Sequence, residues 1–333
     1  MPAAGDDRDG VGHGPAASRL GVLAIVVTAV LWGTTGTVAA AAPTAGPLAI
    51  GAAALGIGGL LQAAIAVRPL RAAWPVLRRH RGLVALGGLA VAVYPLAFYS
   101  SMHVAGVAIG SVVSLASAPL ASGVLERVVD HRPLGRRWVV AAAIGVAGST
   151  VLCLSGAGAA HGATDAAGLA DAAGTAAAAG ATDPAATVLG VLLGLVAGAT
   201  YAVYSWAAHR LMGAGAGRAA SMGAVFGTGG VLLLPVLLLT GGPFVTSPSD
   251  AAVGLSIALV PMFLGYLLFG VGLASVRPST ATTITLLEPA VATVLAVLVV
   301  GERLGPAGWA GLALLGIALV LLVAPPVRRP ARS

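Results

Sequence analysis

Long apolar segments, each about the length of a membrane-spanning helix, alternate with short polar segments along this chain. A bilayer core about 30 Å thick requires roughly 20 apolar residues per helix, and ten such segments are bounded by Arg, Pro, Gly or polar residues. In the first half they cover 20–40, 47–67, 83–102, 105–125 and 138–157. In the second half they cover 186–207, 219–240, 252–274, 279–300 and 306–324. The pattern predicts an all-α integral membrane protein with ten transmembrane helices, the third and fourth forming a tight hairpin near His103.

The segments without this apolar pattern divide the chain into domains. Residues 1–18 contain Gly, Asp and Pro without periodicity, and we expect a disordered N-terminal tail. Residues 158–185 form an Ala/Gly-rich, low-complexity linker that we expect outside the cytoplasm, and 325–333 form a basic cytoplasmic tail. Between them the sequence predicts one five-helix repeat over 19–157 and another over 186–324.

The distribution of basic residues predicts the orientation of these helices. The chain has no Lys and 18 Arg, and with a cytoplasmic N-terminus all of them except Arg303 fall in cytoplasmic segments. The positive-inside rule therefore predicts cytoplasmic N- and C-termini. A nucleic-acid-binding surface is excluded, because the arginines are divided among many loops. Residues 19–42 also fit a signal peptide, but the acidic leader and the polar residues after Trp32 argue against cleavage.

Composition is typical of a membrane protein and excludes several kinds of functional site. Hydrophobic residues make up 58% of the chain and charged residues 9%, against about 25% charged residues in soluble domains. Without Lys the chain has no nucleotide-binding P-loop, which excludes a function driven by ATP through such a loop. Cys153 is the single cysteine, and the His residues have no metal-ligand spacing. We expect no cofactor and no metal.

The two halves are weakly similar to each other. Leu31-Trp-Gly33 in the first segment matches Thr200-Tyr-Ala202 in the sixth, and further matches follow in the same order. The matched pairs are Trp32 with Tyr201, Pro119 with Pro289, and Trp138 with Trp309. Because five is an odd number of helices, the second half must enter the membrane upside down. Inverted repeats of this kind are typical of secondary transporters, whose sites lie near the midplane at the repeat interface.

These features together resemble the EamA-type transporters of the drug/metabolite transporter superfamily. The second half is similar through Leu286-Leu-Glu-Pro289 and Gly301-Glu-Arg-Leu304, and the first half through Leu31-Trp-Gly33 and Ser117-Ala-Pro-Leu120. The chain departs from the family pattern at Val128-Val-Asp-His-Arg-Pro133, where Gly-Glu is usual, and in its long linker. The resemblance implies a multi-pass permease of the plasma membrane that moves small organic solutes, often outward.

Glu288 is the one acid within the ninth apolar segment, where a charge is costly and usually functional. In a water-filled cavity it would bind a cationic substrate group or carry a coupling proton, and burial among apolar side chains would favour its protonated form. The alternative is structural, with a neutral carboxyl bonded to a neighbouring helix and Pro289 breaking the helix locally. We expect no other acid to be buried, which excludes a relay of two carboxylates.

Aromatic and hydroxyl side chains in other segments are further candidates for a cavity wall. The sequence predicts a substrate-binding or coupling site formed, with Glu288, by Trp32, Tyr94, Tyr99, Ser114, Tyr201, Tyr204, Ser205 and Thr285. Hydroxyl groups such as Ser114 and Thr285 also serve to pack helices together, so both roles stay open. Trp74, Trp138 and Trp309 are expected to mark the membrane interface.

The predicted function is therefore secondary transport, most simply export, by alternating access, with Glu288 as the candidate for proton coupling. The expected partners are a small-molecule substrate, membrane lipid and protons, in a monomer or homodimer and without nucleic acid. The alternative is a polytopic membrane enzyme or lipid-handling subunit, for which Asp130-His131 offers the one polar pair at the inner face. We expect no enzymatic activity.

Overall fold

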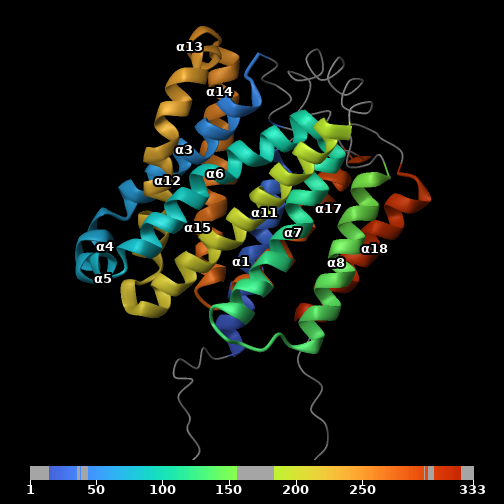
Figure 1. The fold of residues 1–333 in the computed structure, drawn as a ribbon, viewed down its shortest axis with the longest axis horizontal. Coiled ribbons are helices and arrows are strands. Elements are labelled where there is room, and N and C mark those ends of the chain that lie inside the picture. The colour runs from blue at the N-terminus through green and yellow to red at the C-terminus, as the bar shows by residue number, and fades with distance from the viewer. Residues whose placement is uncertain are drawn as a thin grey trace, which may run out of the picture.

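The computed structural model describes residues 15–35, 38, 44–155, 184–295, 297–298 and 304–323. This part of the chain is helical and contains no β-strand, as Figure 1 shows. Nearly all of the expected N-terminal tail, most of the Ala/Gly linker, the basic C-terminal tail and Arg303 lie outside the described residues.

Each predicted apolar segment of the first half overlaps a long helix, although the first helix begins earlier than predicted and ends at Gly33. These helices are α1 (Pro15–Gly33), α3 (Pro47–Ile65), α6 (Arg81–Ala105), α7 (Val107–Val128) and α8 (Arg136–Leu154). Two short helices that the apolar pattern does not predict, α4 (Val67–Ala72) and α5 (Trp74–Arg79), connect α3 to α6. The connection from α6 to α7 is a single residue, Gly106, whose positive φ of 83° favours glycine. The expected tight hairpin is therefore confirmed.

The second half follows the same plan with more interruptions. Its continuous helices are α11 (Pro184–Leu211), α12 (Arg218–Thr240) and α18 (Pro306–Val323), with the π-helical turn η1 (Met212–Ala216) after α11. Its eighth span consists of α14 (Pro248–Ile257), η2 (Ala258–Leu264) and α15 (Gly265–Leu273), preceded by the short α13 (Gly242–Thr246). The ninth span consists of α16 (Pro278–Ile284), the 3₁₀ turn η3 (Thr285–Leu287) and α17 (Glu288–Leu295).

Within the described residues, eight helices are long and apolar enough to cross a membrane. The first span adds a shorter apolar helix, Arg19–Gly33, and the ninth is divided as above. The chain is thus an all-helical membrane protein, and its total of ten spans stays a prediction.

The packing of the helices repeats when the two halves are exchanged. α6 packs against α11, and α15, the counterpart of α6, packs against α1, the counterpart of α11. α3 packs against its own counterpart α12, and α8 against α18, the pair at one edge of the bundle in Figure 1. This reciprocity is what an in-plane pseudo-twofold axis between inverted repeats produces.

Small residues allow the two halves to approach closely at the centre. Gly190, Gly194 and Gly198 form one face of α11, and a Cβ at Gly198 would lie 1.9 Å from Ser117 Oγ and 2.7 Å from Ser114 O of α7. Such close backbone contact is the usual role of glycines spaced four apart in membrane helices. These glycines therefore place α11 of the second half directly against α7 of the first.

One end of the bundle, which we call the arginine end, carries every arginine that the structure describes. Because the chain alternates in direction, α3, α7, α11 and α15 finish at this end while α1, α6, α8, α12 and α16 begin there. The described arginines, all in or beside these helix ends, are Arg19, Arg68, Arg71, Arg78, Arg79, Arg81, Arg127, Arg132, Arg136, Arg137, Arg210, Arg218 and Arg277.

The tryptophans predicted to lie at the membrane interface divide into two kinds. Trp74 and Trp309 are exposed, with relative accessibilities of 61% and 59%, as expected of residues at the interface. Trp138 is half-buried instead, and its ring packs against Gly123 of α7. Its role is therefore to pack α8 on α7.

Candidate functional site

The ninth span is broken at the point where the lone intramembrane acid lies. The 3₁₀ turn Thr285–Leu287 separates α16 from α17, and the backbone N–H of Glu288 donates to Thr285 O. Pro289 has no N–H to continue the helical ladder. As a result Glu288 begins α17, where the helix dipole favours a negative charge. Discontinuous helices of this kind form binding sites in secondary transporters.

Glu288 faces a small central cavity. The cavity has a volume of about 50 Å³, which is room for a few water molecules. Its polar and aromatic lining consists of Trp32, Thr35, Tyr94, Phe98, Tyr99, Ser111, Tyr266 and Glu288. Thr35 is 9% exposed, and its hydroxyl has no hydrogen-bond partner among the described residues. The cavity thus offers one carboxylate, several hydroxyls and aromatic faces.

A layer of aromatic side chains adjoins the cavity and includes part of its lining. Tyr201 and Tyr204 of α11 stack with ring centroids 5.1 Å apart, and Tyr201 lies 6.1 Å from Trp32, its counterpart in the repeat. Tyr204 Oη is 2.9 Å from Tyr266 Oη. Trp32 donates its Nε1–H to Pro261 O at 3.0 Å. Both halves therefore contribute to one continuous aromatic cluster.

The site collects every tyrosine of the chain. There are five: three line the cavity, and the other two lie in the aromatic layer. Tyrosines of membrane proteins usually mark the two interfaces, so their concentration in the middle of the bundle indicates a different role.

Most of the residues predicted from the sequence come together here. Trp32, Tyr94, Tyr99 and Glu288 line the cavity. Tyr201, Tyr204 and Thr285 adjoin it, because Tyr201 Oη lies 2.9 Å from Thr285 Oγ1 at the helix break and both tyrosine rings contact that of Tyr94.

Two predicted residues belong neither to the cavity lining nor to the group that adjoins it. Ser114 donates its hydroxyl to Gly110 O of its own helix at 2.7 Å, beneath Gly198. Ser205 is fully buried and absent from the lining that the structure describes. The contacts of Ser114 support a role in helix packing, one of the two roles that the sequence allowed.

Sequence reasoning missed Tyr266 and Thr35 as site residues. Tyr266 lies on α15, the counterpart of α6 in the repeat. Because α6 carries two predicted site tyrosines, the repeat indicates that α15 also contributes to the site. Thr35 follows Trp32 by three residues and therefore lies on the same face of the helix. Both positions were within reach of the sequence pattern.

The expectation that Glu288 is the only buried acid is wrong. Glu126 is 2% exposed and Asp250 is 1% exposed. Glu126 accepts hydrogen bonds from Ser279 N–H at 2.8 Å and from Ser279 Oγ at 2.9 Å. It is buried because α7 continues beyond residue 125 to Val128 and the start of α16 packs across its end. Glu126 does not line the cavity of Glu288; it caps α16 from the opposite half.

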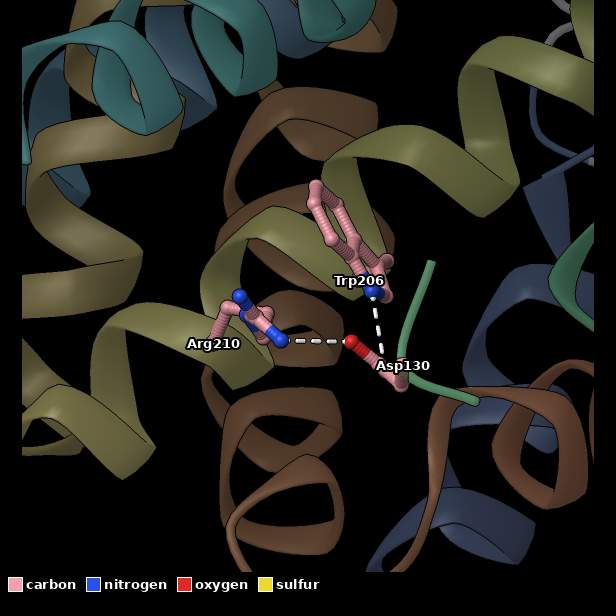
Figure 2. Close-up of polar contacts among 3 residues, drawn as sticks. All are labelled: Asp130, Trp206 and Arg210. Carbon is pink, nitrogen blue, oxygen red and sulfur yellow. Dashed lines mark hydrogen bonds and ion pairs between the residues drawn. The ribbon is translucent and has the colours of Figure 1, made fainter. Parts of the chain in front are cut away.

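A second cavity lies at the arginine end. It has a volume of about 410 Å³ and a charged lining that includes His80, Glu126, Asp130, Arg132, His209, Arg210 and Arg277. Asp130, in the loop between α7 and α8, accepts hydrogen bonds from Arg210 at 2.6 Å and from Trp206 Nε1 at 3.1 Å. Figure 2 shows both partners reaching Asp130 from one helix, α11. Asp130 therefore joins the first half to the second.

Comparison with known proteins agrees with this architecture. The model of the EamA-like transporter family matches residues 19–154 and 188–324. The chain belongs to the EamA-like transporter family. It is 33% identical over 311 residues to a Bacillus subtilis (strain 168) protein described as the uncharacterized transporter YwfM, covering 91% of this chain and 94% of that one. This EamA-family protein is thus a multi-pass membrane transporter.

A solved crystal structure has the same fold. Its TM-score is 0.68 at 19% identity, covering 92% of this chain and 96% of the solved chain. At this identity the similarity shows the fold alone.

We expect Tyr201→Phe to weaken transport without loss of the fold. The substitution removes the hydroxyl that bonds Thr285 at the helix break, and one such bond contributes about 0.5–1.5 kcal/mol, or about 2- to 13-fold in an equilibrium. The measurement is initial flux in proteoliposomes alongside the melting temperature. Thr200→Val is the control, because its hydroxyl bonds carbonyls of its own helix. Equal flux in wild type and Tyr201→Phe would contradict a role for this bond.

Proposed function

We propose that this EamA-family transporter moves small organic solutes with a cationic amine group across the plasma membrane. The observation that carries the proposal is the composition of the central cavity. Glu288 and several aromatic faces line it, while no described lining residue is Arg or His. A carboxylate and the faces of aromatic rings both attract cations. An anionic solute would find no opposite charge there.

Glu288 would couple this transport to protons. In its ionised form it binds the amine, and in its protonated form it releases the amine, so one carboxyl carries the two cations in turn. This gives an antiporter in which protons enter and the solute leaves. The direction follows the usual proton gradient, with the arginine end, both termini and the charged cavity in the cytoplasm.

The structure corresponds to the state closed towards the cytoplasm in this scheme. The central cavity is formed by the parts of α1, α3, α6 and α7 away from the arginine end. The contacts of Glu126 and Asp130 lie between it and that end. Rocking of repeat 19–157 against repeat 186–324 would separate these contacts and open the cavity inward.

Proteoliposomes provide the test of the proposed function. Purified protein is reconstituted with and without an inside-acidic pH gradient, and uptake of radiolabelled amines, amino acids, nucleosides and carboxylates is compared. We expect the gradient to drive accumulation of amines, and we expect no uptake of carboxylates above that of protein-free vesicles. Preference for carboxylates, or amine flux equal to that of protein-free vesicles, would refute the proposal.

The pair between Asp130 and Arg210 is expected to hold the cytoplasmic side closed. Arg210 is 48% exposed, and partly exposed pairs contribute about 0.2–1 kcal/mol, so Asp130→Asn should raise the inward-open population by about 1.5- to 5-fold. The readout is labelling of Ala54→Cys, in the central cavity, by a membrane-impermeant maleimide in inside-out vesicles. Cys153 is the only native cysteine and is buried, so Cys153→Ser gives a clean background.

Two further variants complete this experiment. Arg136→Gln removes a charge from the same end of the bundle and should leave labelling unchanged. Exchanging the charges, Asp130→Arg with Arg210→Asp, should restore slow labelling. If Asp130→Asn labels as slowly as its parent, the pair does not control access to this side.

A further inference from the structure

A groove opens on the outer surface of the bundle beside the short helices α4 and α5. It is bounded by α3, α4, α5, α6 and α12, with α4 and α5 at the left of Figure 1, and its volume is about 920 Å³. If Gly223 and Gly227 of α12 carried a Cβ, it would lie 2.6 Å from Ala66, directly after α3, and from Ala63 of α3, respectively. The two helices therefore pack so closely that the floor of the groove is formed by backbone and small side chains.

The lining of the groove changes from apolar to cationic along its length. Its walls are aliphatic, with Leu60, Val84 and Val231 from three different helices. Arg71, Arg78 and Arg81 line it at the arginine end, and no acid lines it among the described residues. All three arginines are exposed, so their guanidinium groups can extend to the headgroup region while their stems cover apolar surface.

Trp74 fixes the depth at which these arginines lie. It lines the same groove between Arg71 and Arg78 in sequence, and it is 61% exposed. Tryptophan prefers the boundary between headgroups and hydrocarbon. The cationic end of the groove therefore lies at the level of the lipid phosphates, and the apolar part extends into the hydrocarbon.

We propose that this groove binds an anionic phospholipid, with its phosphate on Arg71, Arg78 and Arg81 and an acyl chain along α6 and α12. Basic pockets between membrane helices favour anionic headgroups. A molecule that complements this groove is anionic at one end and apolar at the other. An anionic phospholipid has both properties. A second copy of this chain docked there by twofold symmetry would bring the same three arginines together and be repelled. The site is distinct from the transport cavity and does not depend on the proposed substrate.

The first test compares lipids on the intact, detergent-purified protein. Native mass spectrometry and melting temperature are measured with added phosphatidylglycerol or phosphatidylcholine. We expect retained phosphatidylglycerol and a raised melting temperature for that lipid alone. Glycerol phosphate, which has the headgroup chemistry without acyl chains, should neither bind nor displace it. Equal retention of the two lipids, or displacement by glycerol phosphate, would overturn the proposal.

Variants locate the site on this groove. The triple variant Arg71→Gln, Arg78→Gln, Arg81→Gln should retain phosphatidylglycerol at least about tenfold more weakly, since each arginine near anionic lipid contributes about fivefold. The matched control, Arg68→Gln, Arg79→Gln, Arg136→Gln, removes the same charge from the same end outside the groove. Ala85→Phe fills the groove with its charges intact and should also weaken retention. Equal loss in the two triple variants would show nonspecific charge attraction and overturn the assignment.

Discussion

Glu288→Gln is expected to abolish coupled transport while leaving the protein folded. The amide has nearly the shape of the carboxyl but can neither ionise nor carry a proton, so amine binding and proton exchange are lost together. A hydrogen bond to a charged group contributes about 1.5–3 kcal/mol, so apparent affinity for an amine should fall by about 10- to 150-fold. Reconstituted flux at several external pH values, with the melting temperature measured on the same preparations, checks this result.

The pH dependence separates a coupling role from a structural one. If Glu288 alternates between proton and amine, flux through wild type falls in acid, because the protonated carboxyl no longer binds the amine. The residual flux of Glu288→Gln should not respond to pH. Glu126→Gln is the control, because it removes a buried carboxylate outside the central cavity; it should lower the melting temperature by weakening the cap on α16, while flux keeps its pH response. Normal flux with a normal pH response in Glu288→Gln would refute the coupling role.

Gly198→Val is expected to cause the largest loss of folded protein. A Cβ at this position would lie 1.9 Å from Ser117 Oγ, 2.7 Å from Ser114 O and 3.0 Å from Ala118 N. Two of these atoms belong to the backbone, so α7 and α11 would have to separate along the contact between the two halves. Overpacking of a close-packed site typically costs about 1–3 kcal/mol, and a contact with rigid backbone falls at or above the upper end. Yield of monodisperse protein and its melting temperature give the readout.

Gly316→Val is the matched control for this effect. Gly316 also lies within an apolar helix, α18, but a Cβ there would meet nothing within 4 Å. The same substitution should therefore leave yield and melting temperature within about 0.5 kcal/mol of wild type. Similar losses in both variants would mean that valine in the helix, rather than contact between the halves, is responsible.

The positions of the helices follow from the sequence because the bilayer leaves few alternatives. A segment of about 20 apolar residues must satisfy its backbone internally and so becomes a helix. The hairpin at Gly106 and the break at Glu288-Pro289 are also local, since they depend on one glycine and one proline. The short helices α4 and α5 were missed because they lie between the apolar spans, where arginine and proline resemble a loop.

The direction of each polar side chain was harder to predict. In a soluble helix the polar stripe shows which face is exposed, but lipid and protein interior are both apolar, so helices such as α7 and α11 carry no such stripe. Ser114 and Thr285 are both hydroxyls within apolar spans, yet Ser114 bonds its own helix while Thr285 meets Tyr201. Glu126 was overlooked for the same reason, since its burial depends on a helix of the other half.

The sequence by itself determined that this chain crosses a membrane repeatedly, that its halves are inverted copies, and that an acid and all five tyrosines lie within the spans. Only the tertiary structure decided which of these residues share the central cavity, that Asp130 and Glu126 join the two halves, and that three arginines border an apolar groove. The physical reason is that hydrophobicity fixes the depth of a residue in the bilayer, whereas the rotation of each helix about its axis is set by close packing against its neighbours.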